Sequence, residues 1–196
     1  RVTAVASYET FTSNGWGSQV SHLPDEYRPL YESYDSSAES DHTDFHTTQN
    51  EDSSTDRTSH TASLTFDTDL PGHTLTMLTA FAGYEDELIF DADAGPAPLI
   101  DYWGKEKFWQ FSNELRLTSE PGDIEYVAGL YSFRSNMDLN SYVRLVANAT
   151  PQSLTPELVS FLDEFLPDIP INGEKGDVTV DEETSSVAAF GKTTWR

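Results

Sequence analysis

One stretch of alternating polarity, from residue 111 to 133, limits the folds open to this chain more than any other feature. Apolar and polar side chains take turns along its first half: Phe111, Leu115 and Leu117 against Ser112, Glu114 and Arg116. A period of two is typical of a β-strand, because successive side chains point to opposite faces of a sheet. The sequence EPGD at 120–123 then supplies turn chemistry, since Pro presets φ and Gly accepts a positive φ. A second apolar-rich run follows, so the stretch predicts a β-hairpin with long arms.

The two arms of this hairpin also resemble a known family. The first arm reads QFSNELRL over 110–117, and the second reads EYVAGLY over 125–131. Strands of these two kinds, joined by a short periplasmic turn, occur in the barrels of TonB-dependent outer-membrane receptors, and the hairpin resembles them in order and spacing. The run FGKTTW at 190–195 resembles a later strand of the same barrels.

The resemblance implies a fold, a function and a set of partners. The fold is an antiparallel barrel of about 22 strands with a plugged lumen. Receptors of this family import scarce nutrients across the bacterial outer membrane: ferric siderophores, cobalamin and some sugars. The implied partners are outer-membrane lipid, the TonB complex that acts through an N-terminal region, and a small-molecule ligand such as a metal chelate. No cofactor is implied. Both ends of the chain fall within strand-like runs, and it carries neither plug nor TonB box, so we expect a fragment of such a barrel.

Composition and charge bear on the class of protein. No run approaches the ~20 apolar residues of a transmembrane helix, but a transmembrane strand needs only about 9–11 residues, of which alternate ones are apolar. The formal net charge of -23 argues against nucleic acid as a partner, because phosphate binding needs clustered Lys and Arg. The chain has no cysteine, which excludes disulfides and thiolate metal sites.

Alternation elsewhere predicts an all-β fold. We expect an antiparallel up-and-down meander of about six long strands that forms part of a transmembrane β-barrel, with residues 1–196 as a single partial barrel domain. A short first strand covers residues 1–10, and a second hairpin turns at the sequence LPGH of residues 70–73. A last strand begins near Ser185.

The predicted loops alternate in length. Long loops are expected at about 11–59, 87–107 and 135–184, with short turns between them. Soluble β-sandwiches usually have short loops at both ends. Outer-membrane barrels instead have short periplasmic turns and long external loops. This asymmetry supports the barrel independently of the family motifs.

One short helix is predicted within the third long loop, from Thr155 to Leu166. Thr155 suits an N-cap and Pro156 the first helical position. Four apolar residues then form a stripe at i, i+3, i+4 and i+7: Leu158, Phe161, Leu162 and Phe165.

Charged residues on the central strand are candidates for a polar lumen. Glu114 and Arg116 share the face opposite the apolar residues, and a charge facing lipid at mid-depth would cost roughly 2–4 kcal/mol. On a soluble sheet the two would form a solvent-facing ion pair. Asn113 is the exception, because it falls on the presumed lipid face.

An aromatic cluster is predicted where the second long loop meets the central strand. It comprises Tyr102, Trp103, Phe108 and Trp109. Such residues could form a girdle at the membrane interface, where amphipathic rings settle. In a soluble protein the same residues would be a core cluster.

Four loop residues are candidates for ligand binding: His42, His46, Asp91 and Asp93. The two aspartates resemble the start of a calcium loop, but its other ligand positions and its terminal Glu are missing, so no metal site is predicted. Histidines in acidic loops are common, and charged runs are usually solvated.

No nucleophile elbow, zinc-binding helix motif or phosphate loop is present in the sequence, and no catalytic residue or enzymatic activity is predicted. The sequence favours part of a TonB-dependent receptor in the bacterial outer membrane, which imports a scarce nutrient, foremost a ferric siderophore, by energy-coupled active transport. One alternative is a secreted acidic β-sheet module that binds carbohydrate or calcium. Another is a passive porin, which shares the alternation and the loop asymmetry.

Overall fold

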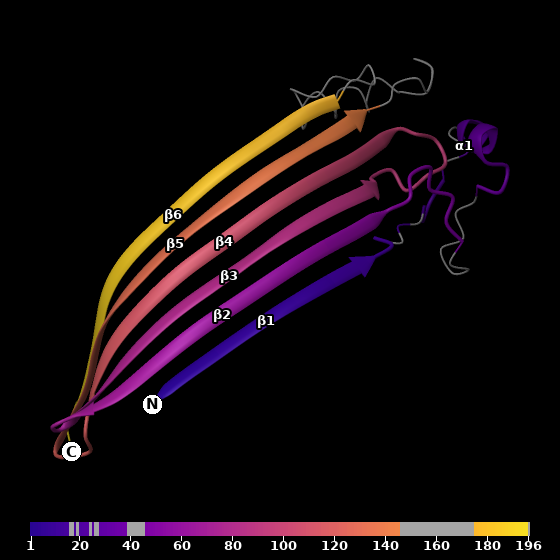
Figure 1. Ribbon diagram of the computed structural model, residues 1–196. Coiled ribbons are helices and arrows are strands. Elements are labelled where there is room, and N and C mark those ends of the chain that lie inside the picture. The colour runs from indigo at the N-terminus through magenta and orange to yellow at the C-terminus, as the bar shows by residue number, and fades with distance from the viewer. Residues whose placement is uncertain are drawn as a thin grey trace.

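The computed structural model describes residues 1–15, 18, 20–23, 25, 28–38, 46–145 and 175–195. These residues form six strands and one short helix: β1 (Val2–Ser13), α1 (Arg28–Tyr34), β2 (Ser54–Leu70), β3 (His73–Asp91), β4 (Ile100–Ser119), β5 (Ile124–Leu145) and β6 (Lys175–Trp195). The strands make one antiparallel sheet in sequence order, with β1 and β6 at its edges (Figure 1). The predicted all-β, six-stranded meander is therefore confirmed, and the sheet is open.

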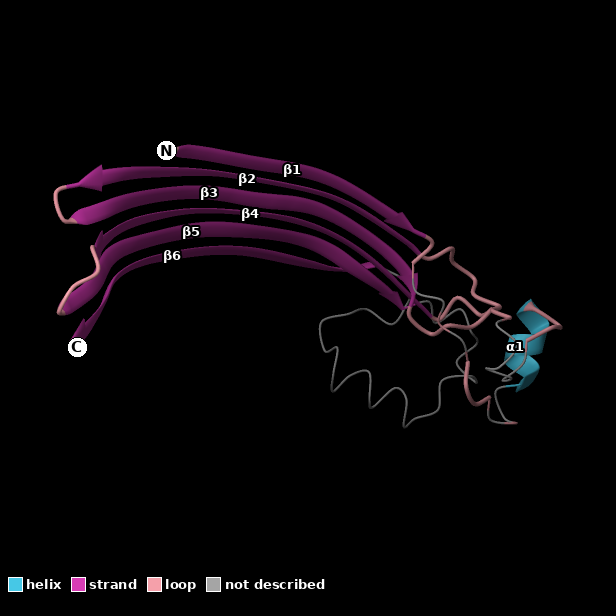
Figure 2. Cartoon of the chain, turned by 90° about the horizontal axis from the view of Figure 1, so that it is seen from below, coloured by secondary structure: helices cyan, strands magenta, loops and turns pink. Residues whose placement is uncertain are grey.

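The strands are long, and the sheet is curved along them (Figure 2). β4, β5 and β6 have 20, 22 and 21 residues. At about 3.3 Å per residue, each spans roughly 65–75 Å. Each pair of strands keeps one unbroken register, so that the same faces stay aligned over the whole sheet.

The two short turns lie where the sequence predicts them. Leu70 pairs with His73 across Pro71 and Gly72, and Gly72 has a φ of 76°, which glycine adopts without a Cβ clash. β4 ends at Ser119 and β5 begins at Ile124, around the second Pro-Gly turn. Both turns lie at one end of the sheet, and α1 lies at the other (Figure 1).

The predicted loop bounds are wrong, because the strands run further than the apolar alternation does. The second loop, expected over 87–107, spans only 92–99, and the first, expected over 11–59, lies between the end of β1 at Ser13 and the start of β2 at Ser54. β5 and β6 extend into the third, expected over 135–184, as far as Leu145 and from Lys175. Alternation marked only the part of each strand that carries apolar residues. The rest consists of polar residues that still keep the backbone register.

The described helix is not the predicted one. α1 lies between β1 and β2, in a segment that we expected to be loop throughout, and it contains no buried residue. Its Arg28 lies 3.9 Å from the carboxylates of both Asp25 and Glu32. The helix predicted over 155–166 lies outside the described residues.

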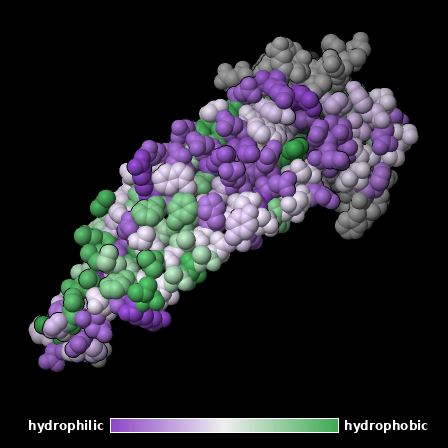
Figure 3. Space-filling view, in the orientation of Figure 1, coloured by the Kyte–Doolittle hydropathy of each residue, from purple (hydrophilic) through white to green (hydrophobic). Residues whose placement is uncertain are grey.

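The register divides the side chains between two faces. Face A carries the odd-numbered residues of β4, and face B carries the even-numbered ones. On face A, large and exposed apolar side chains gather in the half of the sheet nearest the short turns. We call this set the apolar band: Val2, Tyr8, Leu64, Phe66, Leu70, Met77, Trp109, Phe111, Leu115, Ile124, Tyr126, Leu130, Val187 and Trp195. Figure 3 shows hydrophobic residues towards the turn end and hydrophilic residues towards the loop end.

The sheet has no hydrophobic core of its own. Among the described residues, the buried apolar ones are Leu23, Ala38 and Ala97, and all three lie outside the strands. In contrast, Val187 and Trp195 of the apolar band are 83% and 84% exposed. The described sheet is thus a single layer whose apolar side chains have no partner layer in the described part of the chain.

The close packing of β4, β5 and β6 depends on a glycine. A Cβ at Gly129 would overlap the ring of Phe190 and lie 2.8 Å from the backbone oxygen of Leu115. We predict that Gly129→Ala lowers the free energy of unfolding by about 1–3 kcal/mol in a urea titration, as overpacking does. Gly122→Ala is the control, because a Cβ there has no neighbour within 4 Å. Equal stability of the two variants would contradict this packing.

Candidate functional site

The apolar band has a defined height on the sheet. Along β4 the band runs from Trp109 to Leu115, and the partly exposed Leu117 extends the apolar face to a length of roughly 26 Å at about 3.3 Å per residue. A tilted transmembrane strand needs about 9–11 residues, which is about the length of this stretch. Beyond Trp109, the next residues of face A on β4 are Lys107 and Lys105, so the band ends abruptly.

Above the band, face A is covered by charged residues paired across strands. Lys107 Nζ lies 3.3 Å from Glu85 Oε1, and Lys105 Nζ lies 3.6 Å from Glu87 Oε2. A further pair joins Arg134 of β5 to Glu183 of β6, but Arg134 lies in the register row of Phe111, so on β5 charge reaches the upper part of the band. Exposed pairs of this kind contribute about 0–1 kcal/mol each, so they indicate a solvated surface more than a source of stability.

Face B is mixed at the level of the band. Hydroxyl side chains cover this part of β2 and the turn end of β3: Thr61, Ser63, Thr65, Thr74 and Thr76. Apolar residues of face B at the same level are Leu78 on β3 and the exposed Val5 and Phe190 on β1 and β6. The predicted lumen residues Glu114 and Arg116 lie on this face, with Arg116 Nη1 3.6 Å from Glu114 Oε1. On this segment of β4, face A therefore suits an apolar surrounding and face B suits water.

Asn113 interrupts the apolar residues of face A on β4, and its side chain has a partner. The hydroxyl of Thr79, on β3, donates a hydrogen bond of 2.9 Å to Asn113 Oδ1. Thr79 lies directly opposite Asn113 in the register. A polar group that is hydrogen-bonded costs much less to remove from water than one that is not, so the pair is compatible with an apolar surrounding.

The four aromatic residues predicted as one cluster do not form one. Trp103 and Trp109 lie on face A, whereas Tyr102 and Phe108 lie on face B, because β4 is already a strand from Ile100 onwards. Trp109 closes the apolar band. Trp103 lies further out, where it stacks on Tyr142 at 5.5 Å and donates a hydrogen bond to Glu87.

Other aromatic residues mark the two ends of the band. Tyr8, on face A of β1, is 72% exposed and lies in the same register row as Trp109. At the turn end, Tyr126 is hydrogen-bonded to His73, and Trp195 on β6 lies opposite Ile124, two residues from Tyr126 along β5. The sequence analysis missed these residues, since their common level depends on the register of four strands.

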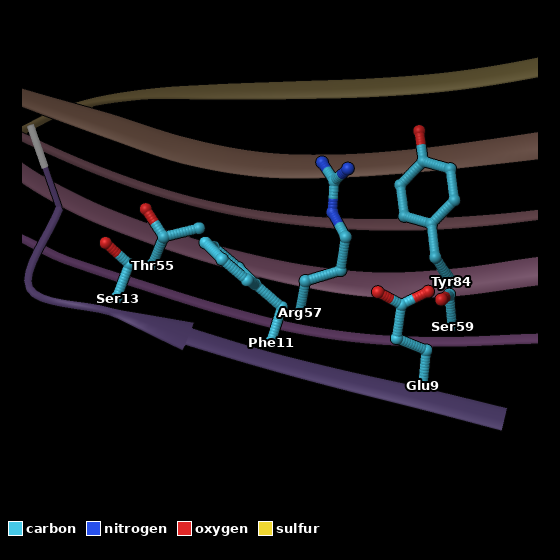
Figure 4. A pocket seen from close by; sticks show the side chains of 7 residues that line it. All are labelled: Glu9, Phe11, Ser13, Thr55, Arg57, Ser59 and Tyr84. Carbon is cyan, nitrogen blue, oxygen red and sulfur yellow. The ribbon is translucent and has the colours of Figure 1, made fainter.

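A cavity of about 550 Å³ lies on face B, on the loop side of the band (Figure 4). Its walls come from β1, β2 and β3, and its lining residues are Glu9, Phe11, Ser13, Thr55, Arg57, Ser59 and Tyr84. Sequence reasoning did not find this site, because none of its residues forms a local motif.

Cross-strand contacts hold the cavity wall in place. Arg57 Nε donates to Asp86 Oδ1 at 2.9 Å, and the guanidinium lies 5.1 Å from the centroid of the Tyr84 ring. Tyr84 in turn stacks on Phe108 at 5.3 Å and donates to Glu106. Each of these side chains is fixed by two neighbours on other strands, so the site is largely pre-formed.

Asp91 and Asp93, predicted as ligand-binding candidates, are engaged inside the β3–β4 loop. Asp91 accepts from the backbone N–H of Ala94 at 2.8 Å and supports its positive φ of 58°. Asp93 accepts from the N–H groups of Leu99 and Ile100, at 3.1 and 2.7 Å. These carboxylates therefore organise the loop backbone.

The same two carboxylates join the first loop to the second. Asn50 donates its backbone N–H to Asp91 Oδ2 at 3.1 Å, and Tyr31 of α1 packs against Gly95, where a Cβ would overlap its ring. Burial, with the nearby Asp93 and Asp91, raises the pKa of Tyr31 to about 12. Burial and the repulsion of Asp91 raise the pKa of Asp93 to about 7, against the opposing effect of its backbone donors.

The remaining loop candidates form no site in the described residues. His42 lies outside them, and His46 is exposed. Where the chain is described, no group of three or more His, Asp or Glu side chains is arranged to hold a metal ion. The described helix is also too short and polar to cross a membrane.

The raised pKa of Asp93 predicts a pH-dependent loop. The folded loop favours the protonated acid, so this stabilisation is complete below the usual pKa of 3.8 and is lost as pH rises through about 7. We expect the hydrogen-exchange protection factor of the Ala92 amide, which donates to the backbone oxygen of Ile100 and closes the loop, to fall between pH 5 and pH 8. Asp93→Asn should remove this dependence, and Asp123→Asn, at the other end of the sheet, should keep it. A protection factor that rises with pH in the unsubstituted protein would contradict the prediction.

Comparisons of this chain with protein-family models, with curated proteins and with solved structures give no match.

Proposed function

We propose that this chain is part of the wall of a TonB-dependent receptor in the bacterial outer membrane. The observation that carries the proposal is the apolar band, whose exposed apolar residues gather on face A for roughly 26 Å along the strands. The opposite face at that level carries Ser and Thr on β2 and fewer exposed apolar side chains, Val5 and Phe190 among them. A barrel wall needs this division, because one face meets lipid and the other meets a polar lumen. The sequences of β4 and β5 resemble strands of TonB-dependent receptors, and this resemblance is the reason for proposing that family.

The exposure of the band favours this function over a secreted binding module. Burial of apolar surface stabilises a protein by about 25 cal/mol per Å², so a soluble sheet would need a second layer over the band. The described residues supply no such layer, and Leu130 at the band centre is 56% exposed. A bilayer would cover the band without any further protein.

The two ends of the sheet give the proposed wall an orientation. The short turns around Gly72 and Gly122 would lie on the periplasmic side, and the long loops with α1 would lie outside the cell. The charged rows of face A would then rise above the membrane into the outer leaflet headgroups and water. The face B cavity would open into the external vestibule of the barrel.

The transported ligand follows from the family resemblance. Ferric siderophores are the first candidate, with cobalamin and some sugars as others, and import would depend on energy from the TonB complex. A passive porin would use the same wall and the same orientation. The two differ in whether uptake requires TonB.

One pair of substitutions tests the wall. Leu115→Lys places a charge in the middle of the band, at a cost of roughly 2–4 kcal/mol in a bilayer. Ser112→Lys places the same charge on face B of the same strand. We expect the first variant to be depleted from the outer-membrane fraction of the host, and the second to be present at the normal level.

The same strains test the transport activity. Host cells that make the unsubstituted protein or Ser112→Lys should take up at least one of three radiolabelled nutrients, a ferric siderophore, cobalamin or maltotriose, and deletion of TonB should abolish that uptake. TonB-independent uptake would point to the porin. Normal abundance and uptake with Leu115→Lys would overturn the proposed lipid-facing band.

A further inference from the structure

The cavity on face B combines a flat apolar surface with polar groups. Phe11 is 52% exposed, and Figure 4 shows its ring beside Arg57, which lies directly opposite it in the register. The Tyr84 ring contributes less, because Arg57 and Phe108 already contact it. The Phe11 ring is therefore the main platform on which a ligand could stack.

The polar groups of the cavity include both donors and acceptors. Arg57 uses Nε for Asp86, and Figure 4 shows its two terminal nitrogens at the end of a side chain that projects away from the strands. The carboxylate of Glu9 lies on the other side of the cavity, and hydroxyl groups come from Ser59 and Thr55. A ligand with several hydroxyl groups could donate to Glu9 and accept from Arg57 at once.

The charge of the cavity argues against an anionic ligand. The positive charge of Arg57 is already balanced by Asp86 at 2.9 Å, and Glu9 adds a negative charge in the same cavity. The carboxylate of Glu106 lies outside the lining of the cavity, where it accepts a hydrogen bond from the hydroxyl of Tyr84. An anionic chelate would be repelled by three carboxylates, and a cation would meet the guanidinium of Arg57. A neutral ligand avoids both penalties.

We propose that this cavity is a binding subsite for a neutral, polyhydroxylated ligand, and specifically for a sugar ring that stacks on Phe11 and bonds to Arg57 and Glu9. The inference rests on the proposed function and deepens it, since it makes a glycan, or a nutrient that carries a sugar, the substrate class. A ring of this kind has an apolar face for Phe11 and hydroxyl groups at its edge for the charged side chains. A volume of about 550 Å³ would hold such a ring.

The experiment uses the protein as its host makes it, purified from outer membranes in neutral detergent. Isothermal titration calorimetry measures its affinity for maltotriose, cellotriose, mannotriose, galactotriose and xylotriose, and for ferric citrate as the anionic chelate. We expect at least one trisaccharide to bind and ferric citrate not to bind. Phe11→Ala and Arg57→Lys should each lower the affinity for that trisaccharide by about tenfold or more. The first removes the ring on which the sugar stacks, and the second replaces the planar guanidinium and its fixed set of donors by a single ammonium group.

The control variant is Tyr8→Leu, which removes an exposed aromatic ring from the same strand on face A. It should leave trisaccharide affinity unchanged. Phe11 and Arg57 are both about half exposed, so neither substitution opens a core, and circular dichroism checks that β-content is retained. Trisaccharide binding that survives both substitutions would overturn the assigned site.

The outcomes separate this inference from the proposed function. Binding of ferric citrate in place of every trisaccharide, with TonB-dependent uptake intact, would overturn the sugar subsite and leave the receptor standing. Trisaccharide binding that depends on Phe11, in a host that shows no TonB-dependent uptake, would support the subsite and overturn the receptor. Absence of binding by all six probes would overturn the subsite.

Discussion

The absence of a core is the constraint on which the rest of the described structure depends. The sheet is a single layer, and the side chains that would fill a core in a soluble protein stand exposed on face A. Backbone hydrogen bonds between strands hold the layer together, but they do not cover its apolar side chains. Something outside the described residues must cover them. We propose a bilayer as this covering, because the band gathers most of the exposed apolar side chains on face A and extends over about the length of a transmembrane strand.

The length of the strands allows two regions with different tasks in one continuous sheet. A crossing of the bilayer needs about 9–11 residues per strand, and β4 and β5 have 20 and 22. The strand residues beyond this length carry the charged rows of face A and line the cavity of face B. Because the register is unbroken, strand pairing alone brings Phe11, Arg57 and Tyr84 together, and no loop contributes to their placement. The loop between β3 and β4 is organised separately, by Asp91 and Asp93, whose carboxylates accept hydrogen bonds from its backbone N–H groups.

Local sequence signals predicted some elements and not others, for physical reasons. Both Pro-Gly turns were found, since their chemistry is complete within four residues. The outer halves of the strands were taken for loops, because polar side chains in a solvated ladder carry no apolar alternation. The aromatic residues around Phe108 were grouped by proximity in sequence, although strand parity sends them to opposite faces. The cavity could not be predicted at all: Phe11 and Tyr84 meet only through the register of β1, β2 and β3, which is a long-range property.

The central claim is that face A meets lipid while face B meets water at the same level of the sheet. The chain has no cysteine, so each position of β4 from Trp109 to Leu117 can be replaced in turn by a single spin-labelled cysteine. Electron paramagnetic resonance in host outer membranes then compares collisions of the label with oxygen, which concentrates in lipid, and with a nickel chelate, which stays in water. The account predicts a strict period of two, with odd positions exposed to oxygen and even positions to nickel. Equal access of the nickel chelate to both sets would contradict it.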